Sequence, residues 1–102
     1  MKNQPIPFKR IIFVCTHSRE NETACANLNR GDNSGLHLVE KLREEVKKRG
    51  LKSKIRICKS GCLDACSQGP NIIISDNQSN LWLQSVEAQD LPEIIAQYID
   101  TI

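Results

Sequence analysis

The sequence predicts an α/β fold in which a four-stranded mixed sheet is flanked by two main helices. Two observations support this prediction: four short strand-like runs, and two longer stretches with apolar residues at helical spacing, in the order strand, helix, strand, strand, strand, helix. A chain of 102 residues, 39% of them hydrophobic, can form one compact core but not two. We therefore expect residues 1–102 to form a single domain.

The first strand is expected at residues 8–14, where Phe, Ile and Val lead directly into Cys15. The following stretch, 16–35, is rich in Asn, Gly and Asp and has no sustained period, so we predict a long loop with room for one helical turn. Loops of this length inside a compact domain are usually functional or disordered. The presence of Cys25 in this loop favours a function.

An amphipathic helix is predicted at residues 34–49. Apolar side chains recur at helical spacing from Val39 to Val46, and Gly50 is a typical stop after them. Polar and apolar residues then alternate in the stretch 54–57, as they do in a half-buried strand. We expect this second strand to end just before the next pair of cysteines.

Two further apolar runs, 71–74 and 81–86, are separated by the turn-forming stretch 76–80, and we predict that they form a hairpin. Asp90 is followed three positions later by Glu93, which is the pattern of a helix-capping box. A helical stripe of apolar residues comes next, so a second helix is predicted there.

The charges are divided unevenly along the chain. Residues 1–59 contain all 14 basic residues and six acidic ones, for a net charge of +8, whereas residues 60–102 contain six acidic residues and no basic one, for −6. The folded protein could therefore be strongly dipolar, although the same pattern is also typical of charges that only solvate opposite faces.

The five cysteines are the most informative residue type. We expect a cytoplasmic protein, because there is no apolar run of signal-peptide length at the start and no stretch of the roughly 20 apolar residues that a membrane span needs. Structural disulfides are rare in that reducing compartment, and the count is odd, so metal binding or redox chemistry is the leading interpretation. Cys58, at the end of a predicted strand, is interpreted as an inert thiol that is buried or half-buried.

The other four cysteines form two pairs, each of which follows a predicted strand. Cys15 ends the first strand, with Cys25 in the loop after it, and Cys62 and Cys66 follow the second strand. If these strands are parallel and adjacent, their C-terminal ends bring both loops to the same edge of the sheet. Cysteines four positions apart also face the same side of a helical turn.

Four thiolates can hold zinc, a [2Fe–2S] cluster or a [4Fe–4S] cluster. Structural zinc usually has two short C-x(2–4)-C knuckles, and only the second pair has that spacing. The bacterial [4Fe–4S] spacing and the plant-type [2Fe–2S] spacing are absent, and a Rieske centre lacks its second histidine, since only His17 follows a cysteine closely. A thiol enzyme is disfavoured because the chain has neither C-x-x-C nor C-x(5)-R.

The two pairs also resemble a known family. A C-x(8–12)-C pair at the end of the first strand, followed by the loop G-C-x-x-x-C-x-x-G-P at residues 61–70, resembles the thioredoxin-like [2Fe–2S] ferredoxins. Residues 82–86 are similar to the W-Y-x-x-V strand of that family, with Leu83 in place of the tyrosine, and residues 90–95 are similar to its last helix. The resemblance implies a thioredoxin-like fold and a homodimer of one-electron carriers rather than an enzyme. It implies one [2Fe–2S] cluster per chain, with the ligands Cys15, Cys25, Cys62 and Cys66.

We accordingly expect redox proteins as partners, either a reductase or an acceptor enzyme, and neither nucleic acid nor a membrane. Two alternatives stay open: a cluster-bearing subunit of a larger redox complex, and a zinc-binding module with four cysteine ligands. Lys59, next to the ligand loop, is a candidate partner contact or an ordinary solvated lysine. His17 and His37 are expected to be a polar loop residue and a helix-surface residue.

Overall fold

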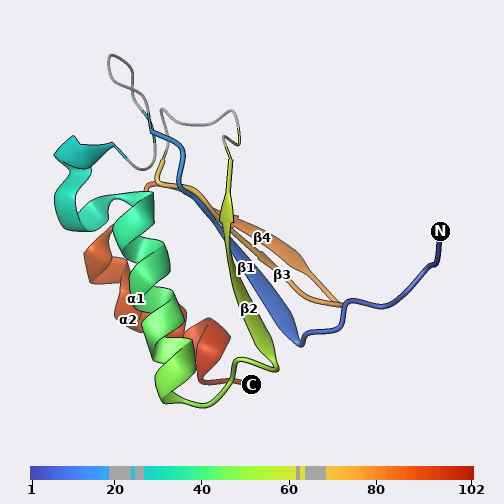
Figure 1. The fold of residues 1–102 in the computed structure, drawn as a ribbon. Coiled ribbons are helices and arrows are strands. Elements are labelled where there is room, and N and C mark those ends of the chain that lie inside the picture. The colour runs from blue at the N-terminus through green and yellow to red at the C-terminus, as the bar shows by residue number, and fades with distance from the viewer. Residues whose placement is uncertain (19–23, 25–26, 62, 64–68) are drawn as a thin grey trace.

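The computed structural model describes residues 1–18, 24, 27–61, 63 and 69–102. Its four strands are β1 (Arg10–Cys15), β2 (Ile55–Ser60), β3 (Ile72–Ser75) and β4 (Asn80–Leu83). They form one sheet in the spatial order β2-β1-β3-β4 (Figure 1). β1 and β2 are parallel, whereas β3 is antiparallel to both β1 and β4. The predicted mixed sheet and its hairpin are therefore confirmed.

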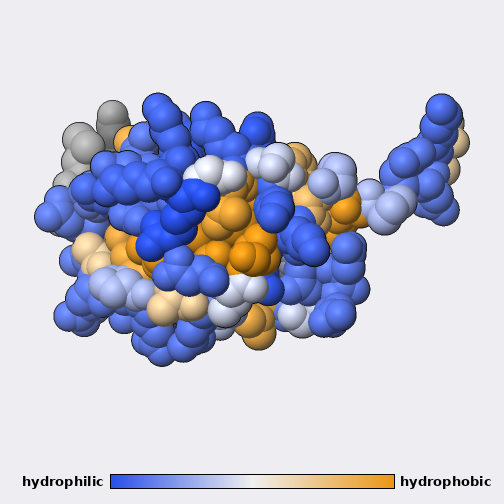
Figure 2. Space-filling view, turned by 90° about the horizontal axis from the view of Figure 1, so that it is seen from below, coloured by the Kyte–Doolittle hydropathy of each residue, from blue (hydrophilic) through white to orange (hydrophobic). Residues whose placement is uncertain are grey.

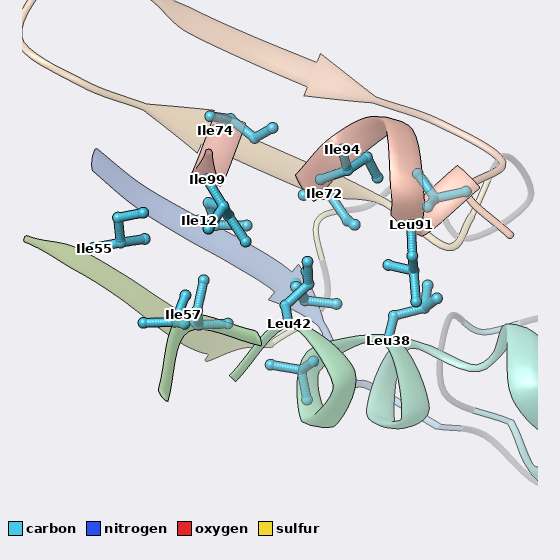
Figure 3. Close-up of a cluster of buried hydrophobic side chains, with 14 residues drawn as sticks. Ile12, Leu38, Leu42, Ile55, Ile57, Ile72, Ile74, Leu91, Ile94 and Ile99 are labelled. Atoms are coloured by element: carbon cyan, nitrogen blue, oxygen red, sulfur yellow. The ribbon is translucent and has the colours of Figure 1, made fainter. Parts of the chain in front are cut away.

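The helices lie together on one face of the sheet (Figure 1). α1 spans Gly35–Lys48, and α2 (Leu91–Ile94) continues as a π-helical turn, Ile95–Ile99. Within the described ranges, no helix is both long enough and apolar enough to cross a membrane. The aliphatic core lies between helices and sheet (Figure 3) and consists of Ile12, Val14, Leu38, Val39, Leu42, Val46, Ile55, Ile57, Ile72, Ile74, Val86, Leu91, Ile94 and Ile99.

Both ends of α1 follow from local residue chemistry. The hydroxyl of Ser34 accepts the backbone N–H of His37 at 3.2 Å, which satisfies one of the free donors of the first turn. At the other end, Gly50 has a φ of +65°, a conformation that costs glycine little. The N–H of Leu51 then donates to the carbonyl of Val46 at 3.1 Å. The predicted stop at Gly50 is confirmed.

The capping box before the last helix does not lie where the sequence pattern put it. A 3₁₀ turn, Ala88–Asp90, precedes α2, and the box joins Glu87 to Asp90 rather than Asp90 to Glu93. The Asp90 carboxylate accepts the backbone N–H of Glu87 at 2.9 Å. The prediction was wrong because the extra turn makes Asp90 the third residue of an earlier helical start, so its side chain reaches back along the chain.

β4 is shorter than the predicted run 81–86. Ser85 has a φ of +52°, which interrupts an extended strand. Val86 nevertheless stays in the core, and its N–H donates to the carbonyl of Pro70 at 3.1 Å. Val86, at the end of the predicted run, therefore packs in the core beside the start of β3 and does not extend the strand pairing of β4.

The face of the sheet opposite the helices has an apolar row that crosses all four strands. Cys58 pairs with Phe13, Phe13 with Ile73, and Ile73 with Trp82. Paired residues project to the same face, and alternate residues such as Ile12, Ile57 and Ile72 are in the core on the other side. Phe13, Ile73 and Cys58 are half-buried, whereas Trp82 is 49% exposed. No helix of the described residues lies on this face, which we call the open face.

The two ends of the sheet differ in the residues that they present. The C-terminal ends of β1 and β2 lie beside the start of β3, at the top of Figure 1. Figure 2 shows the opposite end, where apolar side chains are visible among hydrophilic ones and the N-terminal segment extends away from the body of the molecule. Cys15, the predicted ligand that the structure describes, lies at the first of these ends.

Candidate metal centre

Cys15 is the predicted ligand that the structure describes. It is the last residue of β1 and is completely buried. Its N–H donates to the carbonyl of Asn71 at 3.1 Å, and the next N–H, of Thr16, donates to the carbonyl of Ser60 at 3.1 Å. The Thr16 hydroxyl adds a second bond to the same Ser60 carbonyl, at 3.3 Å. Cys15 and Thr16 are thus tied to two residues that stand on either side of the second cysteine loop in the sequence.

The sheet topology explains this position. In the parallel pair of β1 and β2, Cys15 is opposite Ser60, the last residue of β2. In the antiparallel pair of β1 and β3, Val14 is opposite Ile72, so β3 begins where β1 ends. The condition for bringing the two cysteine loops together, that β1 and β2 are parallel neighbours, is therefore met. Ser60 and Asn71, which flank the second cysteine pair in sequence, thus lie beside Thr16 and Cys15, at the edge of the sheet where α/β proteins commonly place binding sites.

Arg30 links the first cysteine loop to the second. Its Nε donates to the carbonyl of Ala24 at 2.6 Å, and its Nη1 donates to the carbonyl of Gly69 at 3.2 Å. Ala24 is fully buried and immediately precedes Cys25, whereas Gly69 belongs to the predicted ligand loop. Our sequence reasoning did not single out Arg30. What the sequence does show is that a basic residue lies in the long polar loop, a few residues after the predicted ligand Cys25.

The backbone around Arg30 is defined by local hydrogen bonds. Arg30 lies in a 3₁₀ segment, Leu28–Asn33, and its N–H donates to the carbonyl of Asn27 at 3.0 Å. Gly31 follows with a φ of +55°, in the left-handed region that favours glycine. The side chain of Asn33 then accepts the N–H of Ala88 at 2.7 Å, which attaches this segment to the start of the last helix.

Three of the four predicted ligands, Cys25, Cys62 and Cys66, lie outside the described residues, so the ligand set stays a prediction. Among the residues that the structure does describe, no group of three or more His, Cys, Asp or Glu side chains converges on one point. Cys58 is a free, half-buried thiol on the open face of β2. This agrees with the predicted burial of Cys58.

The other candidate polar residues have specific surroundings. Lys59 is 44% exposed, and its Nζ lies 3.9 Å from a carboxylate oxygen of Glu40 on α1. His37 is half-buried in the first turn of α1, with its Nδ1 3.9 Å from an Asp32 carboxylate oxygen. His17 is also half-buried, and it is not without an interaction partner. His37 therefore lies on α1 as predicted, although it is less exposed than a free surface residue.

The described residues fit a thiolate-bound, anionic group. Cys15 offers a sulfur ligand shielded from water, which favours metal–thiolate bonds over competing hydration. The guanidinium of Arg30 places positive charge at the same end of the sheet, where it would compensate negative thiolates and sulfides. The chemistry of this end of the molecule is therefore suited to an iron–sulfur cluster or another tetrathiolate centre.

Comparison with known proteins identifies a family model and a curated relative that match most of this chain. A protein-family model described as "Protein of unknown function (DUF1636)" matches residues 12–101. A curated relative, "Ferredoxin, 2Fe-2S" of Clostridium pasteurianum, is 33% identical over 95 residues, which cover 90% of this chain and 86% of that protein.

Comparison with solved structures identifies the fold. The wild-type thioredoxin-like [2Fe–2S] ferredoxin from Aquifex aeolicus matches with a TM-score of 0.74 and 22% identity, covering 91% of this chain and 87% of that one. Another structure of a thioredoxin-like [2Fe–2S] ferredoxin from the same organism also has a TM-score of 0.74, at 21% identity, with 92% and 83% coverage. The thioredoxin-like fold predicted from the sequence is confirmed, and the chain belongs to the thioredoxin-like [2Fe–2S] ferredoxin family.

Proposed function

We propose that this chain binds one [2Fe–2S] cluster through Cys15, Cys25, Cys62 and Cys66 and transfers single electrons between redox proteins. One observation is central to the proposal: the buried Cys15 and its neighbour Thr16 are hydrogen-bonded to Asn71 and Ser60, on both sides of the second cysteine pair. The naming of the curated relative as a 2Fe–2S ferredoxin supports the choice of cluster.

The bound cluster would supply one-electron chemistry, its formal charge changing from −2 to −3 on reduction. The protein would exclude water from the cluster and compensate the negative charge of the cluster. Cys15 is withdrawn from solvent, and the Arg30 guanidinium supplies positive charge near the loops. None of these tasks requires a substrate cleft or a general base, so we propose an electron carrier rather than an enzyme. A cytoplasmic location belongs to the same proposal, because free thiolates need a reducing compartment.

We propose that a second copy of the chain covers the open face and forms a homodimer. The apolar row of Cys58, Phe13, Ile73 and Trp82 crosses the sheet, and its outermost member, Trp82, is half exposed. Large aromatic side chains in that setting are typical of the centres of protein interfaces. Two such faces, one from each copy, would bury the row.

The charge distribution supports docking of a redox protein at the β2 edge. Because the sheet order is β2-β1-β3-β4, the basic first part of the chain contributes α1 and the outer strand β2, whereas the acidic last part contributes the other edge. A groove of about 500 Å³ lies between α1 and β2, and it is lined by four basic, two acidic and three apolar residues. Its lining is Glu40, Arg43, Glu44, Val46, Lys47, Lys52, Ile55, Arg56 and Ile57.

This basic edge extends to the candidate cluster end. Lys59 directly precedes Ser60, whose carbonyl is bound by Thr16. Arg43 lies further down the same edge, where Nε and Nη2 donate to the carbonyl of Ile57 at 3.4 and 3.3 Å. We propose that an acidic redox partner docks here, because complementary charge accelerates encounter and orients the partner.

The decisive experiment is anaerobic purification, or reconstitution of the reduced chain with iron and sulfide. We expect two iron and two labile sulfide per chain, a visible spectrum of a [2Fe–2S] centre, and an electron paramagnetic resonance signal after one-electron reduction. Stoichiometric zinc without sulfide would contradict the cluster and favour a zinc module with four cysteine ligands. Isolation of the loaded chain only in a stable complex with other proteins would favour a subunit of a larger redox assembly.

A further inference from the structure

We propose that Arg30 is a positioning residue for the cluster: it fastens the segment before Cys25 to the end of the Cys62–Cys66 loop and raises the reduction potential. This inference rests on the proposed function. It starts from one side chain that binds the main chain of both cysteine-bearing segments, at Ala24 and at Gly69.

The contacts of Arg30 connect parts of the chain that are distant in sequence. Its Nε bonds a carbonyl six residues away, and its Nη1 bonds a carbonyl 39 residues away. The guanidinium is planar and presents its N–H donors in a fixed fork, so the two bonds set the relative position of both segments. A lysine has the same charge but no such fork, and it would retain at most one bond at a time with comparable geometry.

The fold itself holds Arg30 in place. Its backbone N–H donates to the carbonyl of Asn27, and the side chain of Asn33 binds the N–H of Ala88 near the last helix. The Ala24 carbonyl, which accepts Nε, also accepts the N–H of Asn27 at 3.5 Å. The guanidinium is therefore supported by both local and long-range contacts.

The charge of Arg30 acts differently on the two redox states. A nearby cation stabilises a formal charge of −3 more than one of −2, so it favours the reduced cluster. The effect persists where side chains are partly buried, because water and salt screen the interaction less. Arg30 is half-buried. Fastening the segments and tuning the potential are therefore separable tasks of one side chain.

Two substitutions separate these tasks. In Arg30→Gln both the fork and the charge are lost, so we expect a roughly three- to tenfold lower ratio of reduced to oxidised cluster at a fixed applied potential. Tenfold corresponds to a shift of about 59 mV for a one-electron couple. In Arg30→Lys the charge is retained, so we expect the potential to return most of the way to that of the unmodified chain. Cluster loss to a chelator should be several-fold faster in both variants, because neither keeps the fork.

The matched control is Arg49→Gln, which removes another guanidinium that binds a main-chain carbonyl, that of Glu45 on α1. We expect its potential and chelation rate to stay close to those of the unmodified chain. Equal potentials in the unmodified chain and Arg30→Gln would overturn the tuning role. Equal chelation rates in the unmodified chain and both Arg30 variants would overturn the fastening role.

A readout without the cluster completes the test. The hydrogen bonds of Arg30 join protein groups only, so the reduced, metal-free Arg30→Gln chain should unfold at a lower urea concentration than the unmodified chain. An unchanged midpoint would also count against the fastening role. If the unmodified chain itself takes up zinc and no sulfide, the proposed function fails, whereas the metal-free comparison still tests the contacts of Arg30.

Discussion

The backbone N–H of Cys15 donates a 3.1 Å hydrogen bond to the carbonyl of Asn71. This bond joins the last residue of β1 to the residue just before β3, and both residues are completely buried. The side chain of Asn71 also accepts the indole N–H of Trp82 at 3.0 Å, which connects the same point to β4. These bonds connect β1, the residue before β3, and β4 at the end of the sheet where Cys15 lies.

Cys15→Ser should impair cluster binding, whereas Cys58→Ser should leave it intact. Cys15 is bonded to Asn71, which follows the second cysteine pair in sequence, whereas Cys58 lies on the open face of β2. Serine is close in size to cysteine, so loss of the thiolate should dominate over any change in packing. We expect iron and labile sulfide per chain to fall several-fold in Cys15→Ser only. Loss of the cluster in Cys58→Ser with retention in Cys15→Ser would reverse the assignment.

Acid should weaken the fold partly through Asp76. The N–H groups of Gln78 and Ser79, each at 2.8 Å, and then the nearby Arg10 guanidinium lower the pKa of this carboxyl below its ordinary value. A lowered pKa gives stability that is fully present above the unfolded value of about 3.9 and is lost as pH falls through the folded value.

The measurement is thermal unfolding of the unmodified chain and of Asp76→Asn between about pH 6 and pH 2.5. Asparagine keeps an oxygen that can accept the two N–H bonds but has no charge to lose. The stability difference between the two proteins should therefore be constant above about pH 5 and should shrink below about pH 4. A difference that stays constant through the acid range would exclude Asp76 as a source of acid sensitivity.

Association should depend on the open face. We expect Trp82→Lys and Ile73→Lys each to weaken the homodimer at least tenfold, because each would place a charge in the apolar row. Sedimentation at several concentrations measures this. Leu36→Lys, on an exposed position of α1, is the control and should leave association unchanged. Cluster content must be checked for Trp82→Lys, since Trp82 also binds Asn71. A monomeric unmodified chain at tens of micromolar would rule out the dimer.

Electron transfer should respond to charge at the cluster end of the β2 edge. Oxidation of the reduced protein by the anion hexacyanoferrate(III) should slow several-fold in Lys59→Glu and should lose part of its dependence on ionic strength. The cation hexaamminecobalt(III) should show the opposite trend. Glu93→Lys on α2 changes the charge by the same amount in the opposite sense. Equal and opposite effects of the two variants would indicate net charge rather than a local docking edge.

The sequence by itself determined the elements and their kinds. Its periodicities predict the strands, the hairpin and α1, because alternation and helical spacing are local properties of the chain. The parallel pairing of β1 and β2 was only a condition of the expected site, and the structure supplied it. The end of α1 at Gly50 is also a local feature. Glycine adopts a positive φ at little cost, so this single residue indicates where the helix stops. The four ligand positions Cys15, Cys25, Cys62 and Cys66 are implied by the family resemblance, and all four remain predictions.

Only the tertiary structure decided which residues meet. No local pattern indicates that Arg30 joins Ala24 to Gly69, because its second partner is 39 residues away in sequence. The open face is also a product of register, since Phe13 and Ile12 look alike in sequence but project to opposite sides of the sheet. The capping box shifted to Glu87 because a 3₁₀ turn formed ahead of α2. Contacts of this kind depend on how distant segments pack, and residue spacing alone does not contain that information.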